Sequence, residues 1–151
     1  MIKLQNVEKV YKSENGNVTA LNDINLEFES SGMVFVVGRS GSGKTTLLNI
    51  IGSLDHIDNG EVSVTFPNED EYNLSAASEK ELDEYRNLHV GFVFQEYNLL
   101  KDWSIRDNIL LPVRQQYTEG AEQEEEKILE QVLHETDLNI KPERKANELS
   151  G

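Results

Sequence analysis

The sequence predicts an α/β fold, and three observations lead to that prediction. Two short apolar runs, 33–37 (MVFVV) and 90–94 (VGFVF), have the composition of strands that are buried on both faces. A glycine-rich loop follows the first run and leads into residues 45–54, which suit a largely buried helix. Residues 20–28 alternate apolar and polar positions, as a half-buried antiparallel strand does. We therefore expect an incomplete parallel sheet with helices, an N-terminal antiparallel β-subdomain and the start of an α-helical subdomain.

The other segments of the first half fit this scheme. Residues 2–11 are strand-like and run into the turn-rich sequence SENGN. The sequence DNG at 58–60 turns the chain into a second alternating strand over 61–66. The polar stretch 67–87 predicts a surface loop and then a short helix, because Ser78-x-x-Glu81 forms a capping-box pattern.

The second half predicts helices. Residues 95–103 read as a loop, and 104–112 as a short helix with Ser104 as its N-cap and Pro112 as its stop. Residues 119–138 are expected to form the longest helix. Its acidic first turns suit the positive end of the helix dipole, and its apolar positions repeat at helical spacing.

Composition and charge exclude several classes of protein. With 28 acidic and 14 basic residues, the net charge is −14, and no basic cluster stands out, which disfavours nucleic-acid binding. The absence of cysteine excludes a disulfide scaffold and a thiolate metal site. No apolar run approaches the ~20 residues that cross a bilayer, and the first residues do not form a secretory signal. Together these observations suggest the cytoplasm.

The glycine-rich loop carries the pattern of a phosphate-binding loop. Gly38-x-x-x-x-Gly43-Lys44-Thr45 matches Walker A and lies between a predicted strand and a predicted helix. Gly38, Gly41 and Gly43 allow positive φ angles, so that successive backbone N–H groups can point inward at phosphate oxygens. The positive end of the following helix adds to the same anion site. The loop therefore predicts a P-loop NTPase core.

The side chains of the loop suit the same ligand. Lys44 would bring its charge to the β- and γ-phosphates, and Thr45 would offer a hydroxyl to Mg²⁺. Thr46 is placed to reach the α-phosphate. The candidate nucleotide-binding residues of this loop are Gly38, Arg39, Ser40, Gly41, Ser42, Gly43, Lys44, Thr45 and Thr46.

Three further features narrow the class of P-loop protein. Tyr11 ends the first predicted strand, Gln95 follows the second buried run in VGFVFQEYNLL, and the chain ends in ELSG. With Walker A, in this order and at this spacing, they make the chain similar to the N-terminal part of the nucleotide-binding domain of an ABC transporter. The resemblance covers essentially all 151 residues.

The resemblance implies a role for each of these residues. Tyr11 would stack on adenine, where a ring face gives contact without close hydrogen-bond readout. Gln95 would be the Q-loop glutamine, a catalytic residue that touches Mg²⁺ and the attacking water. Thr45 and Gln95 are thus the candidate metal-binding residues. In a dimer, the family's Leu-Ser-Gly-Gly-Gln signature clamps the γ-phosphate held by the other subunit, and its first part is matched here by Leu149, Ser150 and Gly151.

The resemblance also implies ligands and partners. ATP and Mg²⁺ are the expected ligands, and a second nucleotide-binding domain is the expected dimer partner. A membrane permease, separate or fused, would hold the protein at the inner face of the cell membrane. Residues 95–103 and the following helix, with apolar side chains on an expected surface, would contact it, unless those side chains pack within the helical subdomain. The stretches VYKSENGNVTALNDINLEF, LLNIIGSLD and GFVFQEYNLL resemble the branch that serves macrolide and peptide export and lipoprotein release.

The resemblance further predicts what the chain holds and what it does. Residues 1–95 would form the β-subdomain and the interleaved P-loop core, and 96–151 the helical subdomain up to the start of the signature. The chain would be truncated before the Walker B strand, the catalytic glutamate and the switch histidine, which leaves apolar sheet edges exposed. The expected function is an ATP-binding subunit or domain that binds and hydrolyses ATP to power export, although this chain alone should bind ATP without hydrolysing it.

Three alternatives stay open at this point. A nucleotide-binding or interaction module that never hydrolyses ATP would show ATP-dependent partner binding without turnover. A small P-loop kinase would share Walker A but would leave Tyr11, FVFQ and ELSG unexplained. A DNA-repair ATPase of related architecture is disfavoured by the acidic composition.

Overall fold

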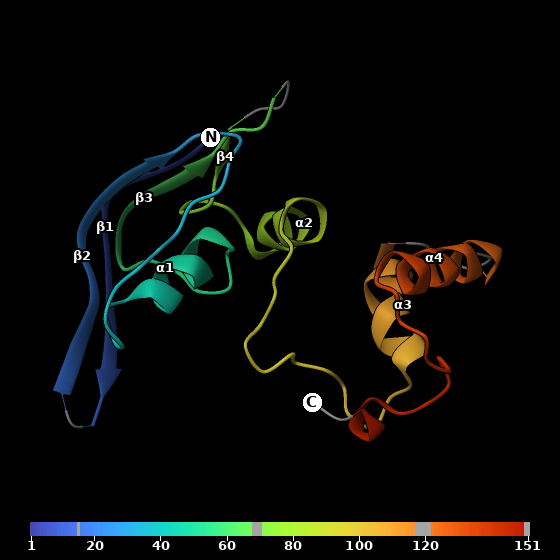
Figure 1. The fold of residues 1–151 in the computed structure, drawn as a ribbon. Coiled ribbons are helices and arrows are strands. Elements are labelled where there is room, and N and C mark those ends of the chain that lie inside the picture. The colour runs from blue at the N-terminus through green and yellow to red at the C-terminus, as the bar shows by residue number, and fades with distance from the viewer. Residues whose placement is uncertain (15, 68–70, 117–121, 150–151) are drawn as a thin grey trace. The chain divides into compact units, whose positions relative to one another are not determined.

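The computed structural model describes residues 1–14, 16–67, 71–116 and 122–149 of a mixed α/β chain (Figure 1). The chain divides into two compact units, Met1–Phe92 and Val93–Gly151. The first unit contains a sheet and two helices, and the second contains helices joined by irregular segments.

The first unit is built on a four-stranded antiparallel sheet with the strand order β2-β1-β3-β4. Strands β1 (Ile2–Ser13) and β2 (Gly16–Phe28) form a long hairpin, and β3 (Asn59–Val64) pairs with the other edge of β1. These three strands confirm the predicted antiparallel segments. The short strand β4 (Tyr72–Asn73) lies in the stretch that the sequence predicted as a surface loop.

Helix α1 (Lys44–Ile51) packs its apolar face on the sheet, as Figure 1 shows. Leu47 and Ile50 are buried in one cluster with Leu4 and Val7 of β1. The helix ends at Ile51, and at its C-cap, Gly52, an added Cβ would lie 2.2 Å from the Phe92 ring. The predicted helix is therefore confirmed, although it ends before residues 52–54 and Leu48 on its other side is exposed.

Helix α2 (Glu79–His89) completes the first unit and has the predicted capping box. The Ser78 hydroxyl accepts a hydrogen bond from the Glu81 N–H, and the Glu81 carboxylate accepts one from the Ser78 N–H at 2.7 Å. Leu82 and Tyr85 bury the inner face of the helix in the common core, and the Tyr85 hydroxyl donates to the Ile51 carbonyl at 2.9 Å. The turn chemistry of the sequence was sufficient to predict where this helix begins.

The prediction of two buried strands at 33–37 and 90–94 is wrong in this structure. Both runs lie outside any helix or strand, and Phe35 and Val93 are 78% and 99% exposed. A strand requires a neighbour to pair its N–H and C=O groups, and no described strand pairs with either run. Because these runs form no strand, they are not edges of the described sheet, and the expectation of uncovered apolar sheet edges stays a prediction.

The second unit holds α3 (Ile105–Gln116), α4 (Glu122–Glu135) and a short 3-10 turn, η1 (Ala146–Glu148). Leu110 of α3 and Leu129 of α4 are the most deeply buried side chains in the described part of this unit. The N–H of Ala146 donates to the Trp103 carbonyl at 3.0 Å, which ties the C-terminal segment to the start of α3.

Two predicted helix limits in the second unit need comment. Pro112 does not stop α3, which continues to Gln116, because a proline removes one backbone donor without preventing the helix from closing its other bonds. The predicted start of the longest helix at residue 119 lies outside the described residues. Within the described residues, no helix is both long enough and apolar enough to span a bilayer.

Candidate functional site

The backbone of the glycine-rich loop has the conformation that the motif requires. Gly41 and Gly43 have φ angles of 77° and 87°, in the left-handed region that favours glycine. The Ser42 N–H donates to the Arg39 carbonyl at 3.2 Å and closes a turn within the loop. A Cβ on Gly43 would lie 2.4 Å from the Ala20 carbonyl oxygen of β2, so only glycine fits there. The loop is thus held in place against the sheet.

The start of α1 is suited to an anion. Gly43 is its N-cap, so no side chain caps the first N–H groups, and no acidic residue lies in the first turn. The Lys44 ammonium lies against the loop and donates to the carbonyls of Gly38 at 3.0 Å and Arg39 at 2.8 Å. Helix donors and a mobile cation therefore lie in the same few residues, as a phosphate requires.

The two threonines that follow Lys44 lie in different environments. Thr45 is exposed, and its hydroxyl is a hard oxygen of the kind that Mg²⁺ accepts. Thr46 is buried, with its Oγ1 atom 3.4 Å from the Tyr11 hydroxyl. Among the described residues, no group of three histidine or acidic side chains could hold a metal ion. A Mg²⁺ ion at Thr45 would therefore take most of its ligands from phosphate and water.

Tyr11 lies beside the start of α1, although 35 residues separate it from Thr46. Tyr11 as a whole residue is 40% exposed, so part of its surface is accessible to a ligand. Its hydroxyl donates to the Asp55 carboxylate at 2.7 Å. The structure thus brings together Tyr11 and the loop, as the resemblance implies, and the stacking role itself stays a prediction.

Sequence reasoning missed Lys9 and Asp55, which surround Tyr11. The Lys9 ammonium donates to the Asp55 carboxylate at 2.6 Å and to the His56 carbonyl at 2.5 Å, and lies 5.2 Å from the centre of the Tyr11 ring. Burial alone would raise the pKa of Asp55, but hydrogen bonds from Lys9, Tyr11 and the His56 N–H outweigh it and lower the pKa. The only local signal is the Lys9-x-Tyr11 spacing on a strand, since Asp55 is distant in sequence.

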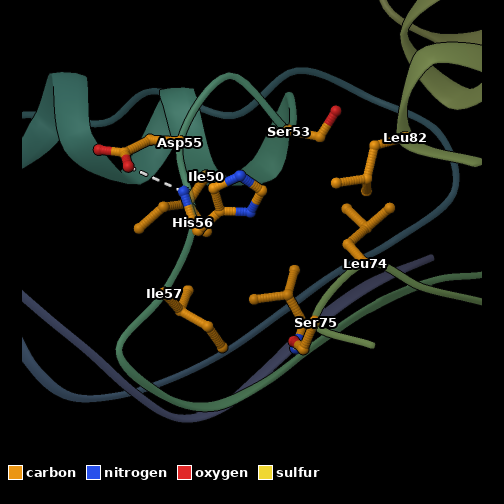
Figure 2. A pocket seen from close by; sticks show the side chains of 9 residues that line it. Ile50, Ser53, Asp55, His56, Ile57, Leu74, Ser75 and Leu82 are labelled. Atoms are coloured by element: carbon orange, nitrogen blue, oxygen red, sulfur yellow. Dashed lines mark hydrogen bonds between the residues drawn. The ribbon is translucent and has the colours of Figure 1, made fainter. Parts of the chain in front are cut away.

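A small cavity lies next to Asp55 in the first unit (Figure 2). Its volume is about 50 Å³, and residues of α1, β3, α2 and the adjoining loops line it. Sites for small ligands usually measure about 300–1,000 Å³, so this cavity cannot hold a nucleotide. The open surface of the glycine-rich loop, rather than this cavity, is the candidate site.

The remaining predicted site residues belong to the second unit. Gln95 is exposed and lies in a turn that is closed by a hydrogen bond from the Tyr97 N–H to the Phe94 carbonyl at 3.2 Å. Leu149 is exposed and donates its N–H to the Ala146 carbonyl at 3.2 Å. Ser150 and Gly151 lie outside the described residues. The roles of Gln95 and of the signature residues therefore stay predictions.

Comparison with known proteins finds a family model and relatives that agree with one another. The model of the family described as "ABC transporter" matches residues 21–151. The bacitracin export ATP-binding protein BceA of Halalkalibacterium halodurans is 33% identical over 151 residues, covering 100% of this chain and 57% of the relative. The lipoprotein-releasing system ATP-binding protein LolD of Bacteroides fragilis is 36% identical over 152 residues, covering 100% and 65%. These relatives agree with the export and lipoprotein-release branch that the sequence resembles.

Two solved structures also match the chain. The dimeric structure of MJ0796, a bacterial ABC transporter cassette, gives a TM-score of 0.87 at 36% identity and covers 100% of this chain and 64% of its own. The dimeric post-hydrolysis state of the same cassette, bound to ADP and Pi, gives 0.84 at 35% identity and covers 99% and 63%. The chain thus spans less than two thirds of the length of each of these relatives.

Proposed function

The chain belongs to the ABC transporter family, and from that premise we propose that it is the nucleotide-binding part of an ATPase subunit or domain that powers export through a membrane permease. The observation that carries this proposal is the loop at 38–46. Its left-handed glycines, its uncapped helix start and its lysine form one anion site on the first unit.

Each of these residues would contact a different part of the bound Mg²⁺-ATP. The loop and helix N–H groups would donate to oxygens of the β- and γ-phosphates, while Lys44 would exchange its two carbonyl contacts for phosphate oxygens. Thr45 would offer its hydroxyl to Mg²⁺, which neutralises phosphate charge when bound. Tyr11 would place a face of its ring against adenine.

Catalysis and coupling would need residues outside the glycine-rich loop. Gln95 would orient the attacking water, and the segment Leu149, Ser150 and Gly151 would act on nucleotide that is held by a second copy in a dimer. Phosphoryl transfer depends on such positioned groups and on charge stabilisation. We therefore expect the 151-residue chain alone to bind ATP and to turn it over at a negligible rate.

The permease contact is proposed for the second unit. Tyr97, Leu99, Leu100 and Trp103 are all at least 40% exposed, in the segment that follows Gln95. Exposed apolar side chains gathered on one short segment are typical of an interaction surface. This contact would place the protein at the inner face of the membrane, with the transported cargo selected by the permease.

The deciding experiment measures Mg²⁺-ATP binding and turnover by the chain and by Lys44→Ala. Loss of the lysine charge should weaken ATP binding by at least about tenfold, because charge-assisted phosphate contacts are among the strongest in the site. Equal affinity of both proteins would contradict the proposal. Rapid Lys44-dependent turnover would show that the chain holds a complete catalytic site.

A further inference from the structure

We propose that Asp55 is a positioning residue that holds the Tyr11 ring in the orientation that accepts the nucleotide base, an inference that rests on the proposed function. We call the hydrogen bond from the Tyr11 hydroxyl to the Asp55 carboxylate the tether. Asp55 follows α1 and Tyr11 lies on β1, so the tether joins the phosphate-binding helix to the base-binding strand. This role predicts that Asp55 contributes to recognition of the base and not of the phosphates.

The hydrogen-bond geometry fixes both ends of the tether. The Tyr11 hydroxyl donates to Oδ2 of Asp55 at 2.7 Å, while Oδ1 accepts from the Lys9 ammonium at 2.6 Å and the His56 N–H at 2.8 Å. The last of these bonds is visible in Figure 2. Both carboxylate oxygens are therefore used, and the carboxylate has little freedom to turn. The lowered pKa of Asp55 keeps it ionised near neutral pH, so it acts as an acceptor for the tyrosine.

The loop that carries Asp55 is itself fixed at two points. The Asp55 N–H lies 3.3 Å from the Asn49 carbonyl in the last turn of α1. Three residues on, the Asp58 carboxylate accepts from the Val10 N–H at 2.6 Å, and the Asp58 N–H donates to the Glu8 carbonyl at 2.9 Å. This loop therefore lies against β1 at residues 8–10, directly before Tyr11. A rigid acceptor can orient a side chain, whereas a mobile one would follow it.

The position of the ring explains why a tether is useful. Tyr11 is 40% exposed, and the Lys9 ammonium lies 5.2 Å from the centre of its ring. An untethered ring would lose rotational freedom on stacking, and that loss weakens binding. Holding the ring in advance removes that cost from binding. The predicted gain is roughly 3- to 10-fold in ATP affinity.

The test uses two ligands and a double-mutant cycle on the 151-residue chain. Affinities for Mg²⁺-ATP and for Mg²⁺ with inorganic triphosphate, which has no base, are measured for the parent, Asp55→Ala, Tyr11→Phe and the double variant. Tyr11→Phe keeps the ring and removes the hydroxyl, with its bond to Asp55 and its longer 3.4 Å contact with Thr46. We expect each single change to weaken ATP binding roughly 3- to 10-fold without changing triphosphate binding, and the double variant to be no weaker than the singles.

A matched control and the opposite outcomes complete the test. Asp58→Ala releases the same loop from Val10 without touching Tyr11, so the ratio of the ATP and triphosphate affinities should not change. Equal ATP affinity of Tyr11→Phe and the parent would overturn the inference, even if Asp55→Ala failed to fold. The inference would also be overturned if the losses of ATP affinity in the two single variants added up in the double variant, or if triphosphate affinity fell as much as ATP affinity. Failure of the parent to bind either ligand, or unchanged binding by Lys44→Ala, would overturn the proposed function first.

Discussion

At the scale of single residues, two glycines of the same loop differ in what surrounds them. Gly41 and Gly43 both have left-handed φ angles, so an alanine at either position would be strained. A Cβ on Gly41 would meet nothing within 4 Å, whereas a Cβ on Gly43 would lie 2.4 Å from the backbone oxygen of Ala20. An alanine at position 41 would therefore introduce conformational strain alone, whereas an alanine at position 43 would add a steric clash.

We expect Gly41→Ala to lower the free energy of unfolding by about 1–2 kcal/mol, the cost of the left-handed conformation. Gly43→Ala should cost at least about 3 kcal/mol, because overpacking against a strand carbonyl adds to the same strain. Urea unfolding of both variants, followed by circular dichroism, measures the difference. Equal losses would mean that α1 does not lie as close to β2 as the structure shows.

The candidate site could be predicted from the sequence only in part. The loop at 38–46 was predictable because its contacts are local, and its residue types determine its backbone conformation. Tyr11 was predictable only through the family resemblance. Asp55 was not predictable, since its partners Lys9 and Tyr11 are distant in sequence and only the packing of α1 on β1 brings the three together.

At the scale of elements, an ion-pair network joins α3 to α4. Arg114 donates to both oxygens of Glu125 at 3.0 Å and to the Asp107 carboxylate at 2.8 Å, while Arg106 pairs with Glu126. A hydrogen bond from Ser104 and then one from Arg114 lower the pKa of Asp107. The hydrogen bond from Arg114 likewise lowers the pKa of Glu125. These carboxylates therefore favour the folded state in their ionised form.

The network predicts a pH dependence of stability. Because the folded pKa values are lowered, the stabilisation is fully present above the unfolded values of 3.8 for aspartate and 4.5 for glutamate. It is lost as the pH falls through the lower folded values. We expect Arg114→Gln to reduce the stability of the α3–α4 unit at pH 6 and to flatten its decline towards pH 3, as read by urea unfolding at each pH.

Lys127→Gln is the matched control, because the Lys127 ammonium lies 3.5 Å from Glu124 within α4 and both side chains are exposed. Such a surface pair contributes little, so its pH profile should follow that of the parent. An unchanged profile for Arg114→Gln would mean that its ion pairs do not hold the two helices together.

The fold was predictable where the signal was local. The alternating strands, the capping box of α2 and helix α1 follow from residue patterns within a few turns of chain. The strands predicted at 33–37 and 90–94 were wrong, because hydrophobicity indicates burial whereas a strand exists only where a partner pairs with it. The prediction that Pro112 ends the helix was also wrong, because the packing of α3 on α4 outweighs one missing backbone donor.

At the scale of the whole molecule, the net charge of the chain has the same sign as the charge of the proposed ligand. The chain carries a net charge of −14, which repels an anionic nucleotide at long range. At physiological salt such repulsion is screened beyond about 8 Å, whereas contacts at the loop act at hydrogen-bond distance. The local donors of α1 and Lys44 must therefore provide the attraction, and the position of bound ATP becomes the central question.

The most direct measurement is amide hydrogen exchange of the 151-residue chain, resolved by residue, with and without Mg²⁺-ATP. Our account predicts that ATP slows exchange at the backbone amides of 38–46 and around Tyr11, while the amides of α4 are unchanged. Protection confined to the second unit, or no protection in 38–46 at saturating ATP, would contradict it.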